Sequence, residues 1–197
     1  MCVGFGWRTF FMQKNNLSIK VGGYMNEIKN KTACFTGHRK IPPEEIPMVK
    51  KRLRKVLIQC IENGYRYFGS GGARGFDLEV AMAVLELKEV YPDIRLILVL
   101  PCRNQTRGWK EIDIQKYEWI KSKADKVVYT SEHYYNGCMQ KRNRHLVDHS
   151  SLCICYYTGQ KGGTEYTVNY ARNNGQSIII INYETLLDCH IPICAFG

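Results

Sequence analysis

Short apolar runs alternate with segments of helical spacing along most of this chain, and this alternation limits the folds that it can adopt. Six runs have the length and composition of strands: 32–35, 65–69, 94–100, 126–129, 152–156 and 177–182. The segments at 42–64, 76–90, 112–123, 139–149 and 164–173 have apolar side chains spaced as in an amphipathic helix. Strands that alternate with helices build a parallel sheet covered on both sides. We therefore predict an α/β fold with a mostly parallel sheet of about six strands and helices on both faces.

One domain can hold all of these elements, because 197 residues that are 45% hydrophobic suffice for one sizeable core. The first 24 residues differ, since Arg8, Lys14 and Lys20 interrupt any apolar centre of a secretory signal. We expect residues 1–24 to be a leader, either disordered or translated from an upstream start, with Met25 as the true first residue. Residues 25–197 then form the single domain.

The longest apolar runs and the cysteines indicate the compartment. No run approaches the roughly 20 apolar residues that cross a bilayer, so we expect no membrane association. Nine cysteines without a CxxC pair are typical of free thiols in a reducing cytoplasm. No residue pattern indicates a metal site, and we expect no cofactor.

The charge and the turns after the strands favour an anionic ligand. The formal net charge is +10, and open α/β sheets bind their ligands beyond the carboxyl ends of the strands. The candidate residues in these turns are Thr36, Gly37, His38 and Arg39, then Ser70, Gly71, Gly72, Arg74, Gly75 and Asp77, then Gly162, Gly163 and Thr164. Exposed amides at a helix start bind phosphate, and Thr164 is the expected N-cap of the last helix. The turn at 70–77 matches neither the Walker A motif nor a strict GxGxxG.

A further basic cluster, Arg142-Asn143-Arg144, lies near the start of the helix before the fifth strand. By itself such a cluster is more often a solvated helix face. Four polar clusters at one edge of the sheet favour a shared site.

The order and spacing of these motifs resemble the SLOG superfamily, and within it the YpsA-like branch. The resemblance runs from about Lys31 to Asn182 and includes Pro101-Cys102 with Trp109. It implies a Rossmann-like fold, but the superfamily includes nucleotide-processing enzymes, DNA-binding proteins and proposed sensors of nucleotide-derived signals. We expect this chain to bind a phosphate-bearing nucleotide or nucleotide derivative as a sensor or processing protein. LOG-like relatives are commonly dimers, so the resemblance implies a homodimer.

One related family, the LOG phosphoribohydrolases, implies an enzyme that cleaves the N-glycosidic bond of a nucleoside monophosphate. Arg142 matches its arginine, whereas its glutamate falls at Thr167, which argues against hydrolysis here. Glu165 is rotated away from that position on a helix. If the chain is an enzyme, Arg142, Asp77 and Glu165 are the catalytic candidates.

A second relative, DprA, implies binding of single-stranded DNA. Its motifs are similar to Ser70–Asp77 and to Arg142-Asn143-Arg144. Stacking aromatics along a basic track are typical of such sites, and Trp109, Tyr134 and Tyr135 are the candidates. Nucleic acid is therefore the alternative partner.

Overall fold

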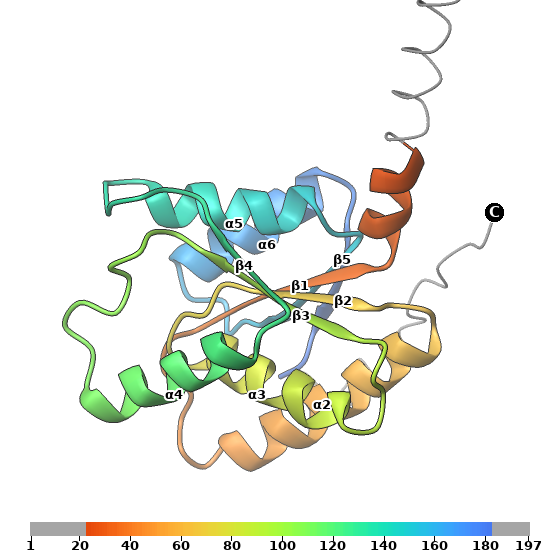
Figure 1. Cartoon of the computed structure of the whole chain (residues 1–197), viewed down its shortest axis with the longest axis horizontal. Helices are drawn as coiled ribbons and strands as arrows, with labels where there is room; N and C mark the ends of the chain where they lie inside the picture. The colour runs from red at the N-terminus through yellow and green to blue at the C-terminus, as the bar shows by residue number, and fades with distance from the viewer. Residues whose placement is uncertain (1–22, 183–197) are drawn as a thin grey trace, which may run out of the picture.

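Six parallel strands form one sheet in the order β4-β3-β2-β1-β5-β6 in the computed structural model, which describes residues 23–182 (Figure 1). The strands are β1 (Thr32–Gly37), β2 (Tyr67–Ser70), β3 (Arg95–Leu100), β4 (Lys126–Tyr129), β5 (Leu152–Tyr156) and β6 (Ser177–Ile180). Every pairing between them is parallel. The predicted α/β fold is confirmed, and within residues 23–182 the sheet is parallel throughout rather than mostly so.

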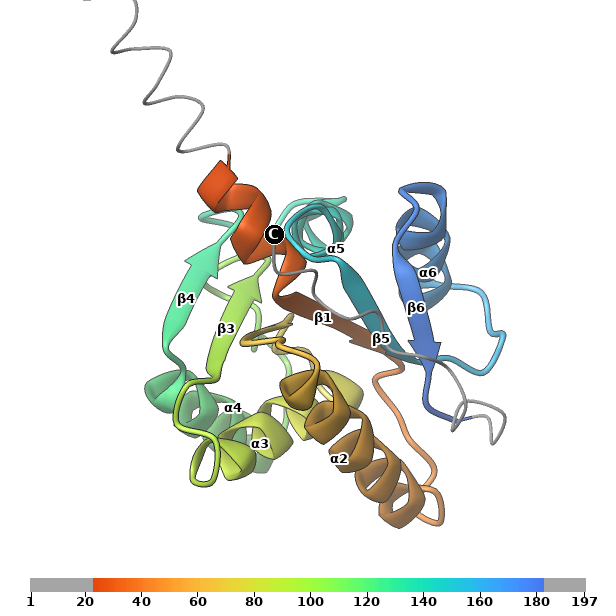
Figure 2. The same cartoon turned by 90° about the vertical axis from the view of Figure 1, so that its right-hand side faces the viewer.

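Helices cover both faces of the sheet. They are α2 (Ile46–Glu62), α3 (Phe76–Lys88), α4 (Glu111–Lys123), α5 (Cys138–Asp148) and α6 (Gly163–Asn173). Figures 1 and 2 show α2, α3 and α4 on one face and α5 and α6 on the other. Residues 23–30 are also helical and lead into β1.

The core lies between these layers, which explains why the central strands are apolar on both sides. All five residues of β5 are buried, as are Ala33, Cys34 and Phe35 of β1. Phe35 and Phe68 face α2 and α3 in the larger core cluster, while Cys34 belongs to a smaller cluster with residues of α5 and α6. Burial on both faces is typical of strands in a parallel sheet.

Several element boundaries differ from the prediction for local reasons. The first long helix begins at Ile46 rather than at the two prolines, because residues 42–45 form a turn in which the Glu45 amide donates to the Pro42 carbonyl at 2.9 Å. The N-cap of α6 is Gly162 with φ 147°, so the prediction of Thr164 was wrong. Thr164 lies inside the first turn of that helix.

The proposed leader is mostly outside the described part of the chain. Residues 1–22 lie there, as do residues 183–197. The helical segment 23–30 spans the expected boundary at Met25, so the division at this residue stays a prediction. Within residues 23–182 no helix combines the length and apolarity needed to cross a membrane, and no group of three or more metal-binding side chains comes together.

The strand order places a topological switch point between β1 and β5. The chain runs outward from β1 through β2, β3 and β4 on one side, and β5 and β6 extend the sheet on the other. The connections after β1 and β5 therefore leave toward opposite faces, α2 on one and α6 on the other. This divergence opens a crevice beyond the carboxyl ends of the two strands, where open α/β sheets bind ligands.

Candidate functional site

A cavity of about 230 Å³ occupies the crevice at this switch point. We call it the switch-point cavity. Its lining includes four groups of residues: 35–39 at the end of β1, Ala73 and Asp77 before and within α3, Met139, Arg142 and Asn143 of α5, and 161–164 at the start of α6. The structure therefore brings two of the four predicted clusters completely, 36–39 and 162–164, and part of the other two around one space; Arg144 is not among the lining residues.

A buried ion pair forms one wall of the switch-point cavity. Nη1 of Arg142 donates to Oδ2 of Asp77 at 3.2 Å, and the same carboxylate oxygen accepts from the Ala73 amide at 3.3 Å. Burial raises the pKa of the Asp77 carboxyl, while Arg142 and the Ala73 amide oppose that rise. Asp77 engages Nη1 of Arg142, while the buried Nε of the same guanidinium has no hydrogen-bond partner in the described part of the chain.

Several backbone amides of the turn before α3 already donate hydrogen bonds to acceptors within the protein. The Gly72 amide donates to Ser70 Oγ at 3.3 Å, and the Phe76 amide donates to the His38 carbonyl at 3.2 Å. Together with the Ala73 amide, three amides of this turn already have protein acceptors. The Asp77 carboxylate lies in the first turn of α3, where the helix N-terminus would otherwise attract an external anion. Binding of a phosphate by this turn stays a prediction.

Two glycines of this region are required by close approaches rather than by a ligand. A Cβ on Gly71 would overlap the guanidinium of Arg142. Gly75 has φ 76°, and a Cβ there would collide with the backbone of Arg39 and His38. These glycines let the ion pair and the loop after β1 pack directly on the start of α3.

The N-terminus of α6 is open by comparison. Its N-cap, Gly162, has no side chain to cap the first amides, and a Cβ on Gly162 or Gly163 would meet no atom within 4 Å. Lys161 adds a positive charge to this wall. Asn143 supports the turn from α5, because its Nδ2 donates to Thr167 Oγ1 at 2.7 Å and that hydroxyl donates to the Gly163 carbonyl. Uncapped amides, the helix dipole and a lysine together suit an anion.

His38 directly follows β1 and lines the switch-point cavity. The backbone amide of Thr158 donates to His38 Nε2 at 3.1 Å, so this nitrogen is an acceptor and the ring is neutral. Burial lowers the pKa of His38 below its ordinary value of 6.5.

Some predicted residues lie outside the switch-point cavity. Ser70, Gly71, Gly72, Gly75 and Glu165 are not among its lining residues. Arg74 lines a neighbouring cavity of about 570 Å³, which we call the Arg74 cavity. Its remaining lining residues are Arg39, Ala73, Asn104, Gln105, Arg107, Gly108, Trp109, Tyr134 and Met139. Arg39, Ala73 and Met139 line both cavities, so the two are adjacent.

Sequence reasoning missed Lys161, Met139 and Gln105 as lining residues. Lys161 stands inside the glycine turn and its charge was a usable signal. Gln105 follows β3 in an irregular loop, and no spacing rule connects it to the turns after β1 and β2.

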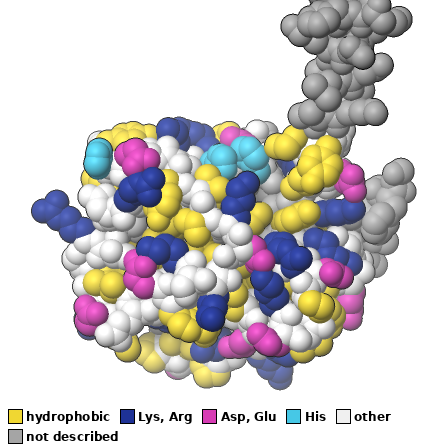
Figure 3. Space-filling view, in the orientation of Figure 1, with side chains coloured by type: hydrophobic (Ala, Val, Ile, Leu, Met, Phe, Trp, Pro, Cys, Tyr) yellow, Lys and Arg dark blue, Asp and Glu magenta, His cyan; other side chains and the backbone are white. Residues whose placement is uncertain are grey.

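The arrangement favours anion binding over acid–base chemistry. Asp77, the carboxylate that lines the switch-point cavity in the described chain, is held by Arg142. Thr167 is buried with its hydroxyl engaged, so no carboxylate occupies the position of the LOG glutamate. Figure 3 shows Lys and Arg interspersed with Asp and Glu on the face in view, so the positive charge is not gathered into one continuous track there.

Comparison with solved structures supports the same fold. DprA from Streptococcus pneumoniae superposes with a TM-score of 0.57 at 19% identity, over 78% of this chain and 50% of that chain. DprA from Helicobacter pylori, whose structure describes a single-stranded DNA binding mode, gives a TM-score of 0.54 at 18% identity, over 76% and 64%. This chain thus spans between half and two thirds of those proteins, and the likeness establishes the Rossmann-like fold.

Sequence comparison is more specific. UPF0398 proteins of Bacillus thuringiensis (strain Al Hakam) and Bacillus cereus (strain AH187) are each 31% identical over 143 residues, which is 71% of this chain and 76% of theirs. The family model described as the YspA SLOG family, with the short name YpsA, matches residues 35–186. That match runs from the middle of β1 through β6 and includes every residue that lines the two cavities, so the chain belongs to the YspA SLOG family, as the motifs predict.

Proposed function

We propose that this protein binds the phosphate group of a nucleotide or nucleotide derivative in the switch-point cavity. The observation that carries the proposal is the pairing, across one cavity, of a buried arginine with an uncapped helix N-terminus. Arg142 is 5% exposed and is held in place by Asp77, and the open start of α6 lines the same cavity.

The charge around the cavity suits a phosphate better than a neutral ligand. Arg39, Arg142 and Lys161 line it, against one carboxylate, that of Asp77, among residues 23–182. Arg142 is preorganised, because Asp77 fixes its guanidinium before any ligand arrives. Preorganised donors bind an anion without the cost of ordering a flexible side chain.

Binding, rather than turnover, is the function that these residues support best. A hydrolase of the LOG type needs a carboxylate near the sugar, whereas Thr167 occupies that position and Asp77 is engaged by Arg142. The test is chromatography of the protein with nucleoside monophosphates, in which release of free base would revive the enzymatic alternative.

Calorimetric titration with inorganic phosphate, ribose 5-phosphate and nucleoside monophosphates tests the binding proposal directly. The informative variant is Lys161→Met, because Lys161 lines the cavity and is exposed, so the fold does not depend on it. We expect ribose 5-phosphate to bind about three- to tenfold more weakly to this variant. Lys141→Met is the matched control, since Lys141 is an exposed lysine of α5 that does not line the cavity. Equal affinities for the native protein and both variants would count against a phosphate beside α6.

Single-stranded DNA is the second candidate ligand. It is favoured by the structural likeness to DprA and by two exposed aromatics, Tyr134 and Tyr135, in the loop before α5. A bound strand would neutralise several cations of the protein. The affinity of the protein for an oligothymidine would therefore fall steeply as the salt concentration rises. A mononucleotide, with fewer phosphate charges, would show a shallower dependence.

We also retain the expected homodimer and cytoplasmic location as parts of this proposal. Cys34, Cys102, Cys138, Cys153 and Cys155 are buried and form no disulfide within residues 23–182, which supports a reducing compartment. Analytical ultracentrifugation measures the oligomeric state, and a monomer at all concentrations would remove the dimer.

A further inference from the structure

We infer that the Arg74 cavity receives the base of the bound nucleotide, and that Gln105 accepts a hydrogen bond from an exocyclic amino group on a purine. This inference rests on the proposed function, because the phosphate in the switch-point cavity fixes the other end of the ligand. It adds a second subsite and a ligand class, an amino-bearing purine nucleotide such as an adenine nucleotide.

The two cavities together have the size of a nucleotide site. The switch-point cavity alone, at about 230 Å³, is smaller than the roughly 300–1,000 Å³ typical of small-molecule sites. The Arg74 cavity adds about 570 Å³ directly beside it. Arg39, Ala73 and Met139 line both cavities. A ligand whose phosphate is bound in the switch-point cavity would extend past these residues into the Arg74 cavity.

The walls of the Arg74 cavity suit a flat ring. The guanidinium of Arg74 lies over the Trp109 ring, 5.5 Å from its centroid, and Trp109 in turn packs edge-on against Tyr117. These contacts hold the planar guanidinium of Arg74 in place. Bases stack on arginine planes as well as on aromatic rings. Tyr134 also lines the cavity and is 62% exposed, so its ring is free to cover a base from the solvent side.

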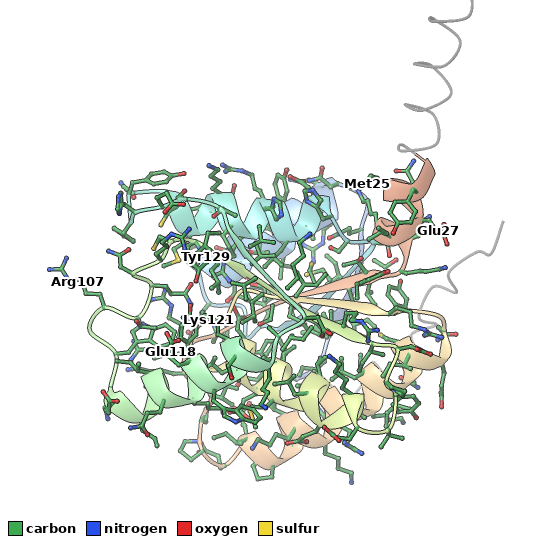
Figure 4. The ribbon with its side chains drawn as sticks, viewed as in Figure 1. Met25, Glu27, Arg107, Glu118, Lys121 and Tyr129 are labelled. Atoms are coloured by element: carbon green, nitrogen blue, oxygen red, sulfur yellow. The ribbon has the colours of Figure 1, made fainter. Side chains whose placement is uncertain are left out.

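The Arg74 cavity is lined by positive charge. Arg39, Arg74 and Arg107 line it, and no carboxylate is among its lining residues in the described chain. Arg107 extends outward from its loop in Figure 4, so it contributes a positive field at the rim rather than a contact at the base. An anionic ligand is therefore attracted into a space whose deeper surface is aromatic and amide in character.

Gln105 supplies the specific contact. Its side chain is 8% exposed, and Nε2 donates to the Gly72 carbonyl at 2.7 Å. That carbonyl is an acceptor, so only the nitrogen of the Gln105 amide can face it, and Oε1 is left without a partner. A buried acceptor without a donor is costly, and the amino group of a purine in the adjoining cavity would satisfy it.

The experiment compares three ligands that differ by defined parts. Ribose 5-phosphate carries no base, purine riboside 5′-monophosphate carries a base without the amino group, and AMP carries both. For the full native chain, calorimetry should give AMP an affinity about tenfold higher than that of the analogue without the amino group. In Gln105→Met this difference should disappear, while the affinity for ribose 5-phosphate stays at the native value.

A second variant guards against a folding defect in Gln105→Met. Tyr134→Ala removes a mostly exposed ring, so the fold should be unaffected, and AMP should bind about tenfold more weakly with ribose 5-phosphate unchanged. Tyr135→Ala is the matched control, because Tyr135 is 45% exposed in the same loop but is not among the residues that line the cavity. It should leave both affinities at the native value.

The outcomes separate this inference from the proposed function. If ribose 5-phosphate fails to bind the native protein, the phosphate subsite is wrong and the inference falls with it. If ribose 5-phosphate binds but AMP and its analogue without the amino group bind equally well, the phosphate subsite stands and the role of Gln105 is overturned. Loss of AMP affinity in Tyr135→Ala equal to that in Tyr134→Ala would overturn the assignment of the base to the Arg74 cavity.

Discussion

Arg142 of α5 and Asp77 of α3 form a buried ion pair that joins helices from opposite faces of the sheet. Nη1 of Arg142 lies 3.2 Å from Oδ2 of Asp77, and the two side chains are 7% and 6% exposed. The pair passes over Gly71, directly beyond the carboxyl end of β2. It therefore contributes both to the fold, by joining α3 to α5, and to the site, by fixing the guanidinium at the switch-point cavity.

Removing one member of this pair should destabilise the protein strongly. Arg142→Met leaves the Asp77 carboxylate buried without its partner, and the expected loss is about 3–5 kcal/mol in the free energy of unfolding. The double variant Asp77→Asn with Arg142→Met removes both charges and should recover part of that loss. Urea denaturation of the two single variants and the double variant gives the coupling energy. Additive losses would mean that the two side chains act independently.

Gly71→Ala tests the same contact from the backbone side. An alanine Cβ would overlap Nη1 of Arg142, so the pair must move or break, and we expect a loss of about 3–5 kcal/mol. Gly163→Ala is the control, because its added Cβ meets no atom within 4 Å and its effect should be within about 0.5 kcal/mol. Thermal unfolding of both variants measures the difference. Equal melting temperatures would show that the ion pair tolerates displacement.

Much of the fold was predictable because it depends on local periodicity. Strands such as β5 and β4 were predicted with the bounds that the structure has, since their apolar runs end at turn residues. The start of α2 was not, because Pro42 and Pro43 form a turn before the helix rather than its first residues. A proline signals the neighbourhood of a helix start, while the hydrogen bonds of the turn set its position.

The site was predictable as a set of residues but not as a set of contacts. Position after a strand sufficed to select His38 and Gly163, because parallel strands end at one edge of the sheet. Arg142 was selected as part of a basic cluster near the start of the helix before the fifth strand. The sequence does not show that Asp77 engages Arg142 from 65 positions away. For the same reason Gln105 was missed, since its position beside Gly72 depends on how the loop after β3 folds back.

His38 should make the stability of the protein depend on pH. Its pKa is lowered by burial from the ordinary value of 6.5, and Nε2 accepts the Thr158 amide only when it is unprotonated. As the pH falls below 6.5, the unfolded chain takes up the proton first, so the free energy of unfolding decreases until the pH passes the lower folded pKa.

The variant His38→Gln isolates this effect, because His145, whose pKa is also lowered, remains in both proteins. The native protein should lose more stability than the variant as the pH falls below 6.5, until the pH passes the lower folded pKa of His38. Urea denaturation across that range provides the measurement. Parallel pH curves for the two proteins would assign the dependence to groups other than His38.

The anion subsite at α6 can be tested separately from folding by placing a charge inside it. In Gly163→Asp the new side chain stands at the first residue of α6, where its Cβ would meet no atom within 4 Å, and its carboxylate should stabilise the helix by about 0.3–1 kcal/mol. The same charge would occupy and repel the site of the phosphate, so the affinity for ribose 5-phosphate should fall by at least about tenfold. Gly163→Asn, nearly equal in shape but neutral, should retain more of the binding. A variant that is more stable and yet binds less is hard to explain by misfolding, whereas native affinity in Gly163→Asp would mean that the phosphate does not lie at α6.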